Sequence, residues 1–171
     1  MGAPRPVPPT ARSVSNYLRL VIDSARAIEN LLYVYAERVD AGDFEGVGDL
    51  FTHGRIVAGT AATGETTVEG RDAVAELFAS TTRRYDDDGT PHTRHVMSNA
   101  IVEVDGDDER GAARSYFTVF QATDDLPLQP IINGRYHDTF HRVDGTWCFD
   151  TRTMLVDRFG DLSQHLLIDL G

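Results

Sequence analysis

The chain has 171 residues, 41% of them hydrophobic, and a formal net charge of −11 at pH 7. This length and composition predict one domain with a substantial core. The negative charge argues against a nucleic-acid partner, because proteins that bind a phosphate backbone need a basic face. All 16 basic residues are arginine, which excludes catalysis through a lysine Schiff base.

Cysteine usage and hydropathy exclude two further classes. The single cysteine, Cys148, has no partner for an intrachain disulfide, so nothing indicates an oxidising compartment. No apolar run is long enough to span a bilayer. The N-terminus lacks the apolar stretch of a signal peptide. We therefore expect a cytoplasmic protein that binds neither a membrane nor nucleic acid.

The first part of the chain reads as an arm followed by two helices. Residues 1–13 carry four prolines and predict a disordered or extended N-terminal arm, which leaves 14–171 as a single domain. Apolar residues spaced three and four apart predict a helix over 25–41. Gly42 is expected to end it, and Asp43 to cap a short second helix.

The rest of the chain changes from helix to strand. We expect a short strand at 55–59, a hairpin turn at 60–66 and a third helix that begins near Gly70 with Asp72 as its cap. Four strands are then predicted, with a longer connection at 124–130 and a short closing helix or tail at 162–170. The four strands cover 93–104, 111–123, 131–143 and 146–157. Helices followed by an antiparallel meander predict an α+β fold, and no glycine-rich phosphate loop is present.

The stretch from Pro91 to Asn99 holds the strongest candidate for chemistry. His95 lies just inside a half-buried strand, where a neutral imidazole can accept a proton near pH 7. A carboxylate beside it, for which Asp40 is the candidate, would fix its tautomer and raise its basicity. Tyr35, on the same helix as Asp40, is a candidate hydrogen-bond donor. From the residues alone, a structural alternative remains open for each of the three. It is a cap or salt-bridge partner at the helix end for Asp40, a strand histidine bonded to backbone for His95, and a core aromatic for Tyr35.

Other polar residues are less informative. Alternation places Arg135 and His137 on one face of a strand, and an inward Arg135 would need an acid or an anionic substrate group. Asp150 and Arg152, on one face of the last strand, are expected to be exposed or to be interface partners. We expect solvated side chains for His53, His92, His141 and His165. The acidic run at 86–88 is expected to be a solvated loop rather than a metal site.

The order of several motifs resembles the SnoaL-like group of the nuclear-transport-factor-two-like superfamily, which includes polyketide cyclases, scytalone dehydratase and the bile-acid dehydratase. The motifs are Tyr35 to Asp40 with Gly42-Asp43-Phe44, Val68-Glu69-Gly70, Thr93-Arg94-His95, Gly134-Arg135-Tyr136 and Val143 to Trp147. The resemblance implies a cone-shaped, curved antiparallel sheet wrapped around N-terminal helices, as in the cystatin-like α+β barrel. It also implies an apolar pocket without metal or cofactor.

The resemblance assigns catalysis to His95, Asp40 and Tyr35, and we expect Arg135, Tyr116, Phe120 and Trp147 to bind the substrate. It implies a lyase or isomerase of dehydratase type, acting on a small cyclic or polyketide-like carbonyl compound. The chain departs from the family where those enzymes place a further ionisable group, because Val119 or Phe120 stands there. A cyclase therefore remains an alternative, as does a non-catalytic subunit like the small subunit of ring-hydroxylating oxygenases. We also expect a homodimer or larger assembly through the sheet face.

Overall fold

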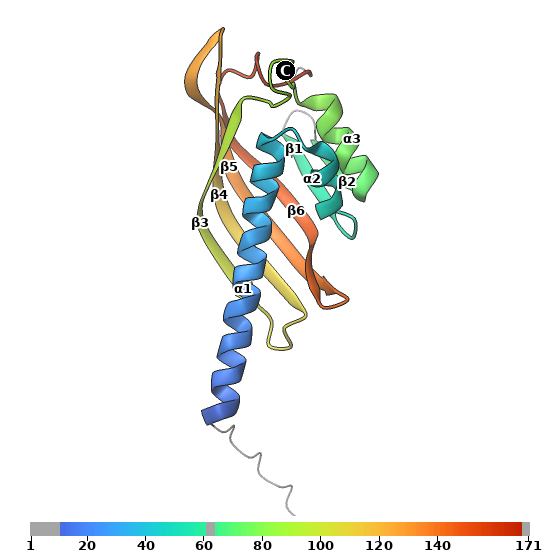
Figure 1. Ribbon diagram of the computed structural model, residues 1–171, viewed down its shortest axis with the longest axis vertical. Coiled ribbons are helices and arrows are strands. Elements are labelled where there is room, and N and C mark those ends of the chain that lie inside the picture. The colour runs from blue at the N-terminus through green and yellow to red at the C-terminus, as the bar shows by residue number, and fades with distance from the viewer. Residues whose placement is uncertain (1–10, 61–63, 169–171) are drawn as a thin grey trace, which may run out of the picture.

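The computed structural model describes residues 11–60 and 64–168, and Figure 1 shows their arrangement. The described helices are α1 (Ala11–Asp40), α2 (Phe44–Leu50) and α3 (Arg71–Thr81). The described strands are β1 (Arg55–Thr60), β2 (Gly64–Glu69), β3 (Thr93–Val104), β4 (Arg110–Thr123), β5 (Leu126–Val143) and β6 (Thr146–Phe159). The expected α+β fold is confirmed.

The described strands form one curved sheet in the order β2-β1-β6-β5-β4-β3. Neighbouring strands are antiparallel except β1 and β6, which are parallel. The long strands β3 to β6 are a meander, joined by turns of two to five residues, as short connections between sequential strands require. The sheet curves around α1, and α2 and α3 lie beside it at the end where α1 stops (Figure 1).

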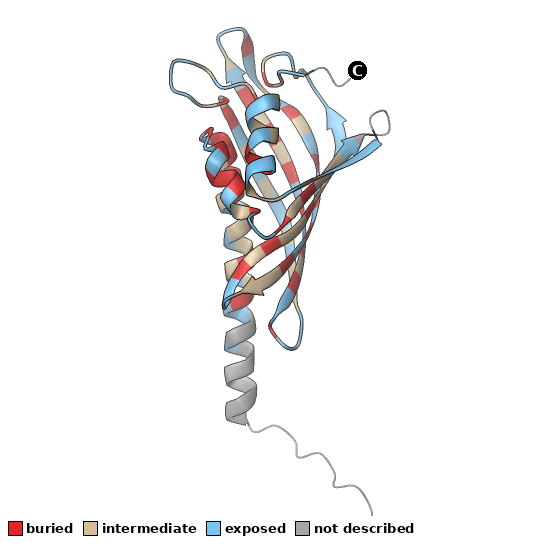
Figure 2. Cartoon of the chain, turned by 90° about the vertical axis from the view of Figure 1, so that its right-hand side faces the viewer, coloured by how far each residue is buried: buried red, intermediate tan, exposed pale blue. Residues whose placement is uncertain are grey.

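The core lies between α1 and the concave face of the sheet. The apolar stripe of α1 is buried there, at Ile28, Leu32, Tyr35 and Val39. Buried and exposed residues alternate along the strands, so each strand buries one face and exposes the other (Figure 2). Helix α1 continues past the sheet at its N-terminal end, away from the rest of the fold (Figure 1).

The helix boundaries follow the predicted signals in part. Asp43 caps α2 as expected, because its Oδ1 accepts a hydrogen bond from the backbone N–H of Gly46 at 2.9 Å. Asp72 was expected to cap α3, which is wrong. The cap position is Gly70, whose φ of +85° suits glycine, and Asp72 instead accepts a hydrogen bond from Arg71.

Three other boundaries differ from the prediction. Helix α1 is continuous from Ala11, so it includes the last residues of the predicted arm, and residues 1–10 lie outside the described part. Strand β2 was not predicted, because its exposed, polar residues carry no alternation. Strand β5 begins at Leu126 rather than at 131, which shortens the preceding turn to Asp124 and Asp125.

Two of the sheet's register shifts, one in β3 and one in β6, decide which of the neighbouring side chains face the core. In β3, two residues oppose one of β4 near Asn99, whose φ is +53°, so Met97 and Ala100 both pack toward the core. In β6, Asp150 is the extra residue between the pairs Phe140–Phe149 and Thr139–Thr151. One extra residue moves the side chains that directly follow it to the other face, which turns Arg152 into the core.

Candidate active site

The structure brings Asp40 and His95 into direct contact. The Nδ1 of His95 lies 2.6 Å from Oδ1 of Asp40, although 55 residues separate them. The backbone N–H of His95 donates to Oδ2 at 2.8 Å, and the hydroxyl of Thr93 donates to Oδ1 at 2.7 Å. Only 7% of the His95 side chain and 9% of the Asp40 side chain are exposed. The two groups therefore form a nearly dry pair between the end of α1 and the start of β3.

The surroundings of Asp40 favour its charged form. Burial opposes ionisation and is the largest influence, but the hydrogen bonds and charge of His95, together with the hydroxyl of Thr93, outweigh it and lower the pKa of Asp40. Helix α1 gives no help, because Asp40 is at its C-terminus, the negative end of the helix dipole. Three hydrogen-bond donors thus hold a carboxylate where the helix alone would disfavour it.

An ionised Asp40 fixes the tautomer of His95. A carboxylate can only accept hydrogen bonds, so the proton between the two groups belongs to Nδ1 of His95. The lone pair of the neutral imidazole is then on Nε2. An imidazole oriented in this way is suited to take a proton from carbon or oxygen, while Asp40 stabilises the imidazolium that forms.

Tyr35 lies in the core beside the buried ion pair of Arg152 and Asp138, and not at the Asp40–His95 pair, called the dyad below. Burial raises its pKa, and its ring makes edge contacts with Phe51, Phe78 and Tyr136. The guanidinium carbon of Arg152 is 4.0 Å from the centre of the Tyr35 ring. Within the described residues, no hydrogen bond joins Tyr35 to Asp40 or His95, so its assignment as a donor to substrate has no contact in support.

Arg152 is buried, so the expectation that it is exposed is wrong. Its side chain is fully buried and makes two hydrogen bonds to Asp138, at 3.0 and 2.8 Å. It is stacked against the rings of Tyr35, Tyr136 and Phe149. The bulge at Asp150 is the reason, since strict alternation from Trp147 would have left Arg152 outside.

The four residues expected to bind substrate do not gather at the dyad. Arg135 is exposed and pairs with Asp157 at 2.8 Å, so it does not face the interior. Tyr116 and Phe120 alternate with the buried positions of β4 and lie on the outer face. Trp147 is buried, but it pairs with Arg142, ten residues along β5 from the strand position level with His95, or about 30 Å away.

A residue that the sequence did not indicate lies near the dyad. His165 was expected to be solvated, yet it is only 6% exposed. Burial is the main cause that lowers its pKa to about 4, followed by the charge of His95, while the charge of Asp40 opposes the shift. Its position depends on backbone contacts of the C-terminal segment, which leave no periodic pattern in the sequence.

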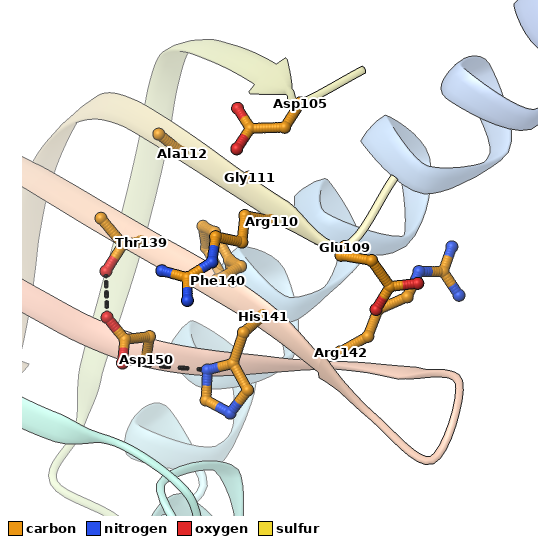
Figure 3. Close-up of a pocket in the computed structure, with 10 residues that line it drawn as sticks. All are labelled: Asp105, Glu109, Arg110, Gly111, Ala112, Thr139, Phe140, His141, Arg142 and Asp150. Carbon is orange, nitrogen blue, oxygen red and sulfur yellow. Dashed lines mark hydrogen bonds and ion pairs between the residues drawn. The ribbon is translucent and has the colours of Figure 1, made fainter. Parts of the chain in front are cut away.

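A second histidine–aspartate pair lies on the outer face, and it is longer and more exposed than the Asp40–His95 pair. His141 Nδ1 and Asp150 Oδ1 are 3.8 Å apart, and both side chains are partly exposed. They line an open cavity of about 660 Å³, where Thr139 also donates to Asp150 (Figure 3). Water screens this pair, so it is a useful control for the buried one.

One group of described residues has the spacing to hold a metal ion. Asp87, Asp88 and His92 offer ligand atoms within 4.8 Å of one another in the loop before β3. His92 already contacts both carboxylates, at 3.1 and 3.4 Å, and stacks on Tyr85. The two aspartates are exposed.

The sequence matches the SnoaL-like domain family over residues 21–153, and the chain belongs to this family. Solved structures agree on the fold. An NTF2-like protein with a cystatin-like fold from Novosphingobium aromaticivorans has a TM-score of 0.66 and 22% identity, over 86% of this chain and 90% of that one. The resemblance expected from the motifs is therefore confirmed.

Two further similar structures, both from the same organism, carry functional descriptions of their own. One is proposed to be a scytalone dehydratase, with a TM-score of 0.64 and 23% identity over 84% of this chain and 91% of that one. The other is the beta subunit of a proposed aromatic-ring-hydroxylating dioxygenase, with a TM-score of 0.63 and 18% identity over 81% and 92%. At these identities the likeness establishes the fold alone.

The remaining comparisons add two facts. No protein of curated function matches the chain. Among the described residues, no helix combines the length and the apolar character needed to cross a membrane.

Proposed function

We propose that the chain is a lyase or isomerase that needs no cofactor and acts by general acid–base chemistry on a small cyclic or polyketide-like carbonyl compound. The observation that carries this proposal is the buried Asp40–His95 pair, with a bond of 2.6 Å. In a dry interior, a base of this kind is not quenched by water and its charge interactions are stronger than in solvent.

The proposed reaction is the loss of water from a carbonyl compound with a hydroxyl group on the β-carbon. His95 removes a proton from the carbon next to the carbonyl, and the electrons of that C–H bond form the new double bond. The C–O bond to the hydroxyl breaks, and the imidazolium of His95 returns its proton to the departing oxygen, which leaves as water. Asp40 remains ionised throughout and stabilises the imidazolium.

The test is a panel of cyclic β-hydroxy ketones, assayed for the conjugated product by absorbance and for hydrogen–deuterium exchange by NMR. We expect Asp40→Asn and His95→Gln to lower both rates at least about a hundredfold, because the first removes the carboxylate that orients the base and the second removes the base. His141→Gln should leave the rates unchanged, because its pair is exposed. Equal rates in all variants would contradict the proposal. An inert wild-type chain would favour the non-catalytic, subunit-like alternative.

We also propose that the chain self-associates through the outer face of the sheet. Three large apolar side chains are about half exposed on β3 and β4, at Val96, Ile101 and Tyr116. Such a patch is typical of an interface between protein subunits. Tyr116→Asp should shift the sedimentation profile toward the monomer, whereas Leu128→Asp, at an exposed site near the hairpin of β4 and β5, should not. A wild-type chain that sediments as a monomer would overturn this proposal.

A further inference from the structure

The C-terminal segment, residues 162–168, crosses the end of the fold where α1 ends and β3 begins (Figure 1). Side chains and backbone both hold it there. Gln121 and Tyr85 donate to the carbonyl of Gln164 at 3.0 and 2.6 Å. The backbone N–H of Arg83 donates to the carbonyl of His165 at 2.8 Å, and that of Leu167 donates to Thr81 at 2.9 Å. The segment is therefore anchored on both sides of His165.

These anchors place His165 beside the dyad. Gln121 is the register partner of Thr93, whose hydroxyl donates to Asp40. The residue that follows Gln164 thus enters the interior next to the carboxylate. His165 is close enough to interact electrostatically with both His95 and Asp40. Three titratable groups from α1, β3 and the C-terminal segment therefore meet at one end of the cone.

The ring of His165 has an unused hydrogen-bonding atom. Its Nδ1 is buried and has no hydrogen-bond partner among the described residues. Buried polar atoms in native proteins are nearly always paired, so an unpaired nitrogen beside a candidate general base requires an explanation. A polar atom of a bound substrate would satisfy it.

The imidazole of His165 is neutral at pH 7. Burial and the neighbouring His95 lower its pKa to about 4. A neutral imidazole has one N–H donor and one acceptor nitrogen. Such a ring can polarise a carbonyl by donating a hydrogen bond without carrying a charge, as a neutral histidine does in triosephosphate isomerase.

We propose that His165 is a substrate-binding residue that hydrogen-bonds a hydroxyl or carbonyl oxygen of a small cyclic compound while His95 accepts the proton. This inference rests on the proposed function and adds the group that contacts oxygen. Val119 is level with His95 on the next strand, so β4 offers no polar side chain at that position. The C-terminal segment supplies a polar side chain there, His165, which takes the hydrogen-bonding role first considered for Tyr35.

The test uses the full chain labelled with ¹⁵N-histidine, with 2-naphthol as the probe for a cyclic hydroxyl compound. At saturation we expect the ring nitrogens of His165 and His95 to shift, and those of the exposed His53 to stay. His165→Leu should weaken binding about tenfold, the loss expected for one hydrogen bond of about 1.4 kcal/mol. His165→Gln, which keeps an N–H donor, should recover most of it, and His53→Leu should bind as the wild type does.

Amide exchange at Arg83 and Leu167 reports whether the segment stays in place in each variant. If His165→Leu releases it, the ring-nitrogen shifts of the unsubstituted chain decide the question. No shift at His165, unchanged affinity in a docked His165→Leu, or no binding at millimolar probe would each overturn the inference. A shift at His95 alone overturns it while leaving the proposed function intact. A shift at His165 in a chain without proton-exchange activity supports the contact and overturns the proposed function.

Discussion

Two arginine–aspartate pairs on the same two strands show how much burial changes the meaning of an ion pair. Arg152 and Asp138 are fully buried between β6 and β5, whereas Arg135 and Asp157 are about half exposed on the outer face. A buried charge that loses its partner remains desolvated, while an exposed one is solvated by water. The two pairs should therefore respond very differently to removal of the arginine.

Arg152→Met should lower the free energy of unfolding by about 3–5 kcal/mol, because it leaves the carboxylate of Asp138 buried and unpaired. The matched change Arg135→Met should alter it by less than about 1 kcal/mol. Urea denaturation of both variants measures the difference. Adding Asp138→Leu to Arg152→Met should restore much of the stability. Similar losses in the two single variants would show that Arg152 is not held as the structure describes.

The pairing of Asp40 with His95 was expected at this scale because of the family resemblance. The residues alone placed Asp40 near the end of a periodic helix and His95 near the start of an alternating strand, but they left a helix-end partner and a backbone-bonded histidine open. The contacts of Arg152 and His165 could not be predicted in the same way. The first depends on one extra residue in β6 and the second on backbone hydrogen bonds between distant segments. Neither leaves a periodic pattern in the sequence.

At the scale of elements, the strands were predicted where hydrophobic alternation was clear and missed where it was not. The bounds of β3 were predicted to the residue, whereas the exposed hairpin strand β2 carries no apolar face. The bulges in β3 and β6 were invisible for a physical reason. A single inserted residue reverses the face of the side chains that follow it. It leaves the amino-acid composition of the strand almost unchanged, so composition does not reveal it.

The C-terminal segment is the element whose attachment should depend most on pH. Because burial lowers the pKa of His165 to about 4, the docked segment disfavours the protonated ring. The contribution of neutral His165 to the docking of the segment is complete above the ordinary histidine pKa of about 6.5. It is lost as the pH falls toward 4, and the loss amounts to up to about 3 kcal/mol.

Amide exchange at Leu167 should therefore speed up between pH 6.5 and 4, after correction for intrinsic rates. In His165→Gln the same amide should lose most of this dependence, because no imidazole remains to be protonated. Loss of protection that is identical in the two chains would contradict the role of His165. Asp40 does not account for a transition in this range, because its lowered pKa places its effect at more acidic pH.

At the scale of the whole molecule, Arg142 ties the far end of the cone together. Its guanidinium donates to the side chains of Ser24 in α1 and Asp108 in the turn before β4, and to the carbonyl of Gly145. It also covers the ring of Trp147, at 4.7 Å from the ring centre. One side chain thus joins the helix to two hairpins of the sheet.

Arg142→Ala should lower the free energy of unfolding by about 2–3 kcal/mol, since it leaves several partners unpaired and uncovers an aromatic ring. The amides of α1 near Ser24 should exchange faster than those near Asp40, which the dyad still holds. Arg114→Ala, whose partner Glu103 is exposed, is the control and should change little. Uniform loosening along the helix would contradict a local role for Arg142.

Asp40 accepts hydrogen bonds from both the backbone and the side chain of His95, so the carboxylate that would orient the base also fastens α1 to β3. Laboratory evolution toward a new reaction would meet this overlap directly. Replacing Asp40 would disturb the scaffold along with the chemistry, whereas changes at the C-terminal segment could retune selectivity and leave the helix attached to the sheet. Libraries that diversify residues 162–168 should hence yield a larger share of variants that fold and have altered selectivity than libraries that diversify the end of α1.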